Sequence, residues 1–300
     1  MAVDPERFTQ HSPYSDPGRH TDRLAAVPDD LTAMCAAARN VIAHYRADLS
    51  DLTLDQQVEV DSRWLEVTLD VDAHRNPAQL TEHRPLQRRV AGCCRDHSLF
   101  VVGALRHHGR PARTRVGFAH YFDPGHAVDH VVVDVHDGHR WRRVEPELPA
   151  HAAFDVHDMP AGPQAPFETA AEAWLRWRAG EQDLSTYGVR GQPVLSGPSF
   201  VGAYVVFEVA HRYGDELLLW DSWGATADPL KNAGLVDDVA SLLVRADAGD
   251  AGAEAELFAR YQQDDRLRPG DQVVTLSPFG TTARVTDLRD GARLDSGRLA

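Results

Sequence analysis

Cysteine is scarce in this sequence. Its 300 residues include three, Cys35, Cys93 and Cys94. A low and odd number of cysteines gives no disulfide framework, and adjacent residues such as Cys93 and Cys94 are poor candidates for a mutual structural bridge. We therefore expect a protein of a reducing compartment, the cytoplasm.

Long apolar runs are also missing. No uncharged apolar segment approaches the length of about 20 residues that spans a membrane. The polar N-terminus (MAVDPERFTQHSPYSDPGRH) has no apolar core of a signal peptide. The sequence contains no internal repeat and no low-complexity tract. It therefore predicts neither a membrane span nor a secretion signal.

Basic residues are outnumbered by acidic ones, 31 to 45, and the formal net charge is -14. Such a charge repels nucleic-acid phosphates and anionic membrane surfaces, so we expect neither as a partner. It favours cationic or amine-bearing partners instead. With 43% hydrophobic and 25% charged residues, the composition is that of a globular protein with a substantial core.

Hydrophobic spacing and turn signals predict helices at both ends of the chain, with a helix and three strands between them. This order is typical of an α+β fold rather than of a regular βαβ alternation. The predicted helices cover 31–45, 55–72, 94–108, 168–179, 198–213, 235–246 and 252–263, and the predicted strands cover 112–122, 129–136, 139–145 and 272–276.

The helix predicted over 94–108 begins at Cys94 and ends at a stop signal, Gly109 followed by Pro111. A helix N-terminus favours negative charge, so it lowers the pKa of a thiol placed there. Its free N–H groups can also hold an oxyanion. Cys94 is therefore a candidate nucleophile, with a small buried hydrophobic residue as the alternative.

A hairpin supplies the partners of that nucleophile. If Asp137 and Gly138 form a two-residue turn, His130 lies directly opposite Glu145, whereas Glu147 is two positions out of register. Directly opposed side chains share a face of the sheet. A carboxylate there can hold one imidazole nitrogen and leave the other for a nucleophile. The alternative is a surface ion pair of little energetic worth.

Four segments of the sequence resemble the core of the transglutaminase-like superfamily. In that family a Gly-x-Cys motif opens a helix that ends in a Gly-x-Pro-Ala-Arg stretch, a histidine starts a strand, and a carboxylate ends the next strand after a tryptophan. The matching segments are 92–98 (GCCRDHS), 106–113 (RHHGRPAR), 129–135 (DHVVVDV) and 141–146 (WRRVEP). The segments 16–20 (DPGRH) and 220–224 (WDSWG) also resemble a bacterial branch of these proteins.

The resemblance implies that Cys94 is the nucleophile, His130 the base and Glu145 the orienting carboxylate, with Trp141 as the family tryptophan. The family usually has aspartate where this chain has Glu145, and often an aromatic residue where it has Val132. The longer side chain of Glu145 can still reach an imidazole.

The fold implied is a transglutaminase-like or papain-like core, in which the nucleophile helix packs on a small antiparallel sheet between helical N- and C-terminal extensions. We expect an N-terminal helical segment over 1–87, the catalytic core over 88–150, a C-terminal helical region packed on the core over 151–268, and a tail over 269–300. The C-terminal helices are expected to cover the cleft.

The chemistry implied is acyl transfer through a thioester acyl-enzyme on an amide, ester or thioester. The acceptor is an amine, which gives amide-bond formation or transamidation, or water, which gives amidase or protease activity. The acyl donor is a small molecule, a peptide or a carrier-bound group, and neither a cofactor nor a metal is implied. Fold and triad leave the substrate open.

Three further residues are candidates for lining the site. Ser98 lies four residues after Cys94 on the same helical face, Trp141 precedes the carboxylate, and Cys93 neighbours the nucleophile and competes with it for that role. Trp220 and Trp223 are expected mainly to pack in the core, with a wall of the substrate cleft as the alternative.

Two other functions stay open. In the first, the core is a catalytically inactive binding scaffold. In the second, the protein is a metal-dependent hydrolase that uses a cluster of histidines and aspartates, although no HExxH or paired Cys/His spacing occurs. That cluster comprises His120, Asp123, His126, Asp129 and His130.

Overall fold

The computed structural model describes residues 5–162 and 165–289. They form an α+β fold in which helices flank a mostly antiparallel five-stranded sheet, an antiparallel three-stranded sheet and a short parallel pair of strands. The α-helices are α1 (Thr21–Ala25), α2 (Leu31–Val41), α3 (Leu54–Glu59), α4 (Leu65–Arg75), α5 (Cys94–His107), α6 (Ala170–Arg178), α7 (Pro198–Arg212), α8 (Ala233–Asp247) and α9 (Ala251–Gln263). The strands are β1 (Ile42–His44), β2 (Val90–Gly92), β3 (Ala112–Asp123), β4 (His126–His136), β5 (Trp141–Val144), β6 (Phe167–Thr169), β7 (Tyr187–Gly188), β8 (Asp221–Ser222), β9 (Gln272–Thr275) and β10 (Arg284–Asp287).

Helices α2, α3, α6 and α9 begin at capping side chains. The carboxylate of Asp30 accepts a hydrogen bond from the Ala33 N–H at 2.9 Å and so starts α2. The single helix predicted over 55–72 is wrong, because the chain forms α3 and α4 with a break between them. In that break Arg63 is fully buried and pairs with Asp221, which a continuous surface helix would not allow.

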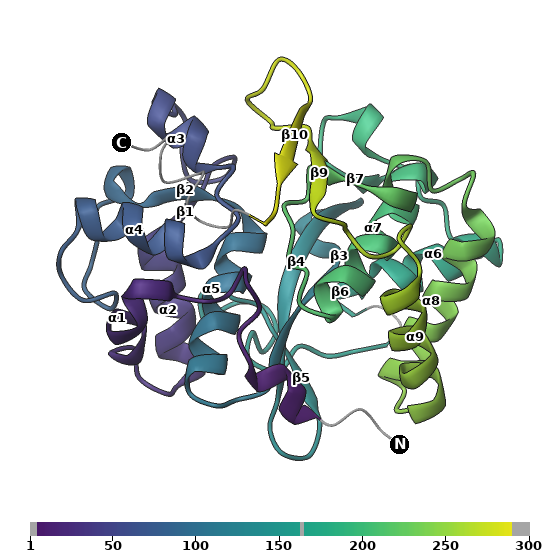
Figure 1. Ribbon diagram of the computed structural model, residues 1–300, viewed down its shortest axis with the longest axis horizontal. Helices are drawn as coiled ribbons and strands as arrows, with labels where there is room; N and C mark the ends of the chain where they lie inside the picture. The colour runs from purple at the N-terminus through teal and green to yellow at the C-terminus, as the bar shows by residue number, and fades with distance from the viewer. Residues whose placement is uncertain (1–4, 163–164, 290–300) are drawn as a thin grey trace.

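The central sheet has the strand order β5-β4-β3-β6, with β7 pairing in parallel to β4. Helix α5 packs against β3 and β4, and α7 packs against β3. Figure 1 shows these two strands between α5 on one side and α6, α7 and α8 on the other. Residues 112–119 are all buried, which explains why this segment lacks the alternation of a half-exposed strand.

The hairpin that joins β4 to β5 differs from the prediction. His136 pairs with Trp141 and Val133 with Val144, so the loop holds four residues, 137–140, and the register is shifted by two positions. The predicted register was therefore wrong. Strand β5 ends at Val144, and the ladder does not reach Glu145.

Buried arginines tie the segment around β8 to the N-terminal half of the chain. Arg63 and Asp221 are 2.6 Å apart with neither side chain exposed. The Arg95 Nε donates to the Glu216 carbonyl oxygen at 3.0 Å, and Arg106 pairs with the Glu216 carboxylate at 2.9 Å. Because Arg95 directly follows Cys94, this segment is fixed next to the start of α5.

The Arg63–Asp221 pair gives a stability prediction. Asp221→Asn removes the carboxylate charge that lies 2.6 Å from the buried Arg63 guanidinium, so we expect the free energy of unfolding to fall by about 3–5 kcal/mol. Urea denaturation measures this loss, and the slope of the unfolding free energy against urea concentration is expected to stay unchanged. The exposed pair of Lys231 and Asp228 is the control, and Lys231→Ala is expected to change stability little. A loss as small for Asp221→Asn as for Lys231→Ala would contradict the structural role of the pair.

The C-terminal part contains more strand than expected. Strand β9 matches the strand predicted over 272–276, and β10 pairs with it in a sheet with β8. Of the predicted tail, residues 290–300 lie outside the described residues. Within the described part of the chain, no helix has both the length and the apolar character that crossing a membrane requires.

Candidate active site

Cys94 is the first residue of α5, and its position is set by the residues on either side. The Asp96 carboxylate accepts a hydrogen bond from the Cys93 backbone N–H at 2.8 Å and another from Arg95 at 2.8 Å. A carboxylate at this end of a helix is favoured by the helix dipole. The helix start at Cys94 agrees with the sequence prediction.

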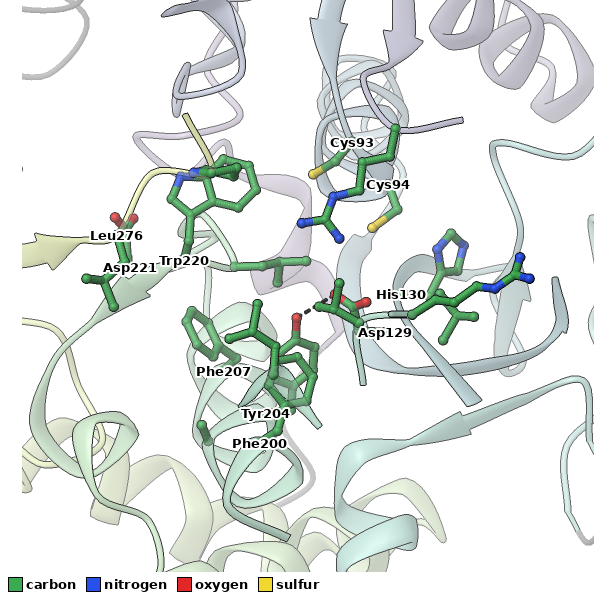
Figure 2. Close-up of a pocket in the computed structure, with 18 of the residues that line it drawn as sticks. Cys93, Cys94, Asp129, His130, Phe200, Tyr204, Phe207, Trp220, Asp221 and Leu276 are labelled. Carbon is green, nitrogen blue, oxygen red and sulfur yellow. Dashed lines mark hydrogen bonds between the residues drawn. The ribbon is translucent and has the colours of Figure 1, made fainter. Parts of the chain in front are cut away.

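Cys93, Cys94 and His130 line a cavity of about 800 Å³. Figure 2 shows the Cys94 thiol and the His130 imidazole turned towards the same space, from the start of α5 and from β4. Side chains of α7 and of the segment around β8 line it as well, together with side chains from 44–47 and 189–195, so residues far along the chain complete the site. Trp220 is among them, whereas Trp223 is buried and donates to the Leu267 carbonyl oxygen at 3.0 Å.

His130 and Glu145 are in direct contact. The His130 Nε2 lies 2.7 Å from the Glu145 Oε2, and neither side chain is more than 2% exposed. Because a carboxylate oxygen only accepts, Nε2 carries the proton and Nδ1 is left as the acceptor of the neutral ring. The pair forms although the predicted register was wrong, since Glu145 lies just beyond the end of β5.

Two donors missed by the sequence analysis hold Glu145 in place. The Tyr121 hydroxyl donates to Oε2, the same oxygen that contacts His130. The Glu147 backbone N–H donates to Oε1 at 2.7 Å. Three donors on one buried carboxylate fix its orientation. Tyr121 ends a predicted strand next to the hairpin, but no pattern in the sequence shows that it reaches Glu145.

Glu147 is a second carboxylate, next to Glu145. Its Oε1 lies 3.0 Å from the His97 Nδ1, and its Oε2 lies 3.9 Å from the His130 Nδ1. Burial opposes the charged form of Glu147, but the nearby imidazoles, His97 first, lower its pKa overall. The distance of 3.9 Å is beyond hydrogen-bond range, so Glu145 rather than Glu147 orients His130.

These contacts determine the protonation of the His130 imidazole and of the Cys94 thiol. Burial lowers the pKa of His130, but the charge of Glu145 and the hydrogen bond to it outweigh burial, so that this pKa is raised. The hydrogen bond to Cys93, burial, and the charge on Glu147 raise the pKa of the Cys94 thiol well above its ordinary value. The expected lowering of this pKa by the helix N-terminus is therefore wrong for the resting site.

This protonation state predicts the pH dependence of alkylation. A raised pKa keeps the thiol protonated to higher pH, so we expect iodoacetamide to label Cys94 with a midpoint above the value of about 8.5 for free cysteine. Cys93→Ala removes the largest cause of the shift and is expected to move the midpoint to lower pH. Peptide mass spectrometry follows the labelling. A plateau of labelling below pH 7 would contradict a protonated resting thiol.

The other predicted lining residues lie in different places. Cys93 lines the cavity. The Ser98 hydroxyl is buried and donates to the Val131 carbonyl oxygen at 2.8 Å, which ties α5 to β4. The Trp141 ring packs edge-on against Phe8, with the ring centroids 5.3 Å apart. Neither Ser98 nor Trp141 belongs to the cavity lining.

Potential metal ligands were searched over residues 5–162 and 165–289. In this part of the chain one group of three ligand atoms lies within 4.8 Å, from His130, Glu145 and Glu147. Of the histidine and aspartate cluster noted in the sequence, it includes only His130. Because this imidazole and the Glu145 carboxylate already bind each other, a metal would have to separate them.

Comparison with known families gives a match over part of the chain. Residues 62–146 match the family model of the transglutaminase-like superfamily, and the match spans Cys94, His130 and Glu145. No match was found among curated proteins or among solved structures. Over residues 62–146 this chain is therefore similar to the transglutaminase-like superfamily.

Proposed function

We propose that this protein is a cysteine-dependent acyltransferase or amidohydrolase with a triad of Cys94, His130 and Glu145. The observation that carries the proposal is the contact of 2.7 Å between the His130 Nε2 and the buried Glu145 carboxylate, made by an imidazole that shares a cavity with Cys94. A nucleophile, a base and an orienting carboxylate form the arrangement that covalent acyl transfer requires.

In the proposed reaction, the Nδ1 of neutral His130 accepts the Cys94 proton as the sulfur attacks the carbonyl carbon of an amide, ester or thioester. The S–C bond forms, and the imidazolium returns the proton to the leaving group as its bond to carbon breaks. Water or an amine then attacks the thioester, with His130 again as base, and frees the thiol.

The backbone N–H of Cys94 is the proposed first oxyanion donor, since the initial N–H groups of a helix have no partner within it. Glu145 holds the proton on Nε2 throughout and stabilises the imidazolium. In this proposal the catalytic core spans 88–150, the chain on either side completes the cavity, and the enzyme works in the cytoplasm, where its three cysteines, all free here, stay reduced.

Turnover of model acyl donors tests the proposal. We expect release of the leaving group from activated amide, ester and thioester donors, and formation of a new amide when an amine is added if the enzyme is a transferase. Because the mechanism uses no metal, dialysis against a chelator is expected to leave the rate unchanged. Loss of the rate on chelation and its return with zinc would favour the metal-dependent hydrolase instead.

An inactive scaffold is the other alternative. It predicts no turnover of any donor and no covalent adduct at Cys94, even when the cavity is occupied. The same assays therefore separate it from the enzyme.

A further inference from the structure

One wall of the cavity is aromatic and apolar. Phe200, Tyr204 and Phe207 occupy one face of α7, because their spacing of four and three residues brings side chains together on a helix. The ring centroids of Phe200 and Tyr204 are 4.3 Å apart. Figure 2 shows this wall across the cavity from Cys93 and Cys94, with the Tyr204 hydroxyl bound to Asp129. A group bound to the Cys94 sulfur would therefore face aromatic rings beside this one polar pair.

The rim of the cavity is apolar as well. Val194 is 88% exposed and Leu276 is 56% exposed, and Phe122 and Leu195 are each 40% exposed, yet all four line the same cavity. Single exposed apolar side chains are ordinary on protein surfaces. Several that converge on one cavity indicate a ligand with an apolar surface.

The carboxylates in the cavity already have partners. Asp123 pairs with Arg190 at 2.9 Å, and Asp129 accepts from the Tyr204 hydroxyl at 2.8 Å. Glu147 and Asp221 contact His97 and Arg63, as described above. A cationic ligand would have to displace one of these contacts. The acidic residues of the cavity therefore do not by themselves favour an amine as the ligand.

The basic groups in the cavity do not favour an anionic ligand either. Arg190 is neutralised by Asp123, and the Arg46 guanidinium lies over the Tyr45 ring, 5.3 Å from its centroid. Burial lowers the pKa of His44, which lines the cavity together with the base His130, so the His44 ring stays neutral near pH 7. The apolar wall and rim are therefore the features that select among ligands.

We propose that the acyl donor of this enzyme carries a bulky apolar acyl group, which packs against Phe200, Tyr204 and Phe207 and passes between the apolar rim residues. The inference rests on the proposed function of Cys94. A cavity of about 800 Å³ lies within the range of small-molecule sites, about 300–1,000 Å³. It has room for an aromatic or extended aliphatic acyl chain beyond the reacting carbonyl.

Binding to the full-length Cys94→Ala variant tests the inference without turnover. Butanamide, hexanamide and 4-phenylbutanamide are the apolar probes, and 5-aminopentanamide, in which an ammonium group replaces the end of hexanamide, is the charged probe. Isothermal titration calorimetry is expected to show affinity rising about fourfold for each added methylene, the factor that corresponds to about 0.8 kcal/mol. The charged probe is expected to bind more weakly than hexanamide.

Exposed rim residues allow variants that leave the core intact. In the Cys94→Ala background, Leu276→Ser is expected to weaken hexanamide binding about fivefold, since it removes apolar contact at the cavity. Leu54 is 78% exposed and does not line the cavity, so Leu54→Ser is the matched control and is expected to have no effect. Phe200→Ala adds a test of the α7 wall, with Phe258→Ala on α9 as its control.

The outcomes separate the two proposals. Equal affinity for butanamide and hexanamide, or tighter binding of 5-aminopentanamide, overturns the apolar acyl group even if the wild-type enzyme turns over acyl donors. Size-dependent binding to the Cys94→Ala variant supports it, even if the wild-type protein forms no acyl-enzyme. In that last case the proposed function fails, and the cavity is a binding site for apolar amides.

Discussion

Cys94→Ala is expected to abolish acyl transfer, with a fall in kcat of at least about a thousandfold. The reason is that the proposed thioester forms on the Cys94 sulfur. Cys93 shares the cavity, but it is the residue before α5 and its side chain leaves the backbone in another direction. The effect is measured as turnover of an activated acyl thioester, which is detected through the free thiol that it releases.

The matched control is Cys93→Ala. Its backbone N–H still binds the Asp96 carboxylate, so the start of α5 is expected to keep its geometry and kcat to stay within about tenfold of the wild-type value, less than about 1.4 kcal/mol in the barrier. If Cys93→Ala instead abolished turnover while Cys94→Ala retained it, the nucleophile would be Cys93 and the assignment of the triad would be wrong.

Glu145→Gln is expected to lower kcat by a factor of about 100 to 10,000 with little change in KM. An amide at this position can present its N–H₂ group to the His130 Nε2. The ring then carries its proton on Nδ1, which is the nitrogen that must accept the proton of Cys94. The variant keeps the size of the side chain and removes its charge, so it tests orientation and charge together.

The same variant is expected to shift the pH profile. Glu145 raises the pKa of His130, and catalysis needs the neutral ring, so wild-type activity rises with pH through that raised pKa. Without the carboxylate charge the pKa falls, and the residual activity of Glu145→Gln is expected to rise at lower pH than that of the wild type. Profiles of kcat/KM between pH 5 and 9 measure the shift.

Glu147→Gln is the control for both effects. This carboxylate lies 3.9 Å from the His130 Nδ1 and contacts His97 instead. We therefore expect a fall in kcat of no more than about tenfold and a smaller shift of the pH profile. If the Glu147 variant lost as much activity as the Glu145 variant, both carboxylates would have to act on His130.

Local patterns were enough to predict the main elements around the site. The stop signal after His108 and the apolar run before it predict α5, and the β-branched run from Val131 to Val133 predicts β4. These features depend on neighbours along the chain, which the sequence shows directly. The short strands β1, β2 and β8 could not be predicted, because each is held mainly by pairing with a distant segment.

The pairing of His130 with Glu145 was predicted from a register that the structure contradicts. The loop takes in Asp137, Gly138, His139 and Arg140 rather than two residues, and this would align Glu147 with His130 if the ladder continued. The ladder stops at Val144, and the Glu145 side chain turns back to the imidazole. The contact between them therefore depends on the end of β5, which turn chemistry alone does not define.

The cavity wall was the part least accessible from the sequence. Its aromatic residues on α7 lie more than a hundred positions after Cys94, and the segment around Trp220 is held by Arg63, Arg95 and Glu216. Buried arginines that bind backbone carbonyls or distant carboxylates carry no local pattern. From the sequence we expected the C-terminal helices to cover the cleft, and considered Trp220 and Trp223 as a cleft wall only as an alternative to core packing.

Trapping of the acyl-enzyme tests the triad most directly. The wild-type protein is mixed with excess activated apolar acyl thioester, quenched in acid within seconds, digested and analysed by mass spectrometry. We predict one acyl group per chain on Cys94, sensitive to hydroxylamine, retained in Cys93→Ala and lost in His130→Ala. The absence of an adduct in the wild type, or an equal adduct on Cys94 in His130→Ala, would contradict catalysis by Cys94 with His130 as its base.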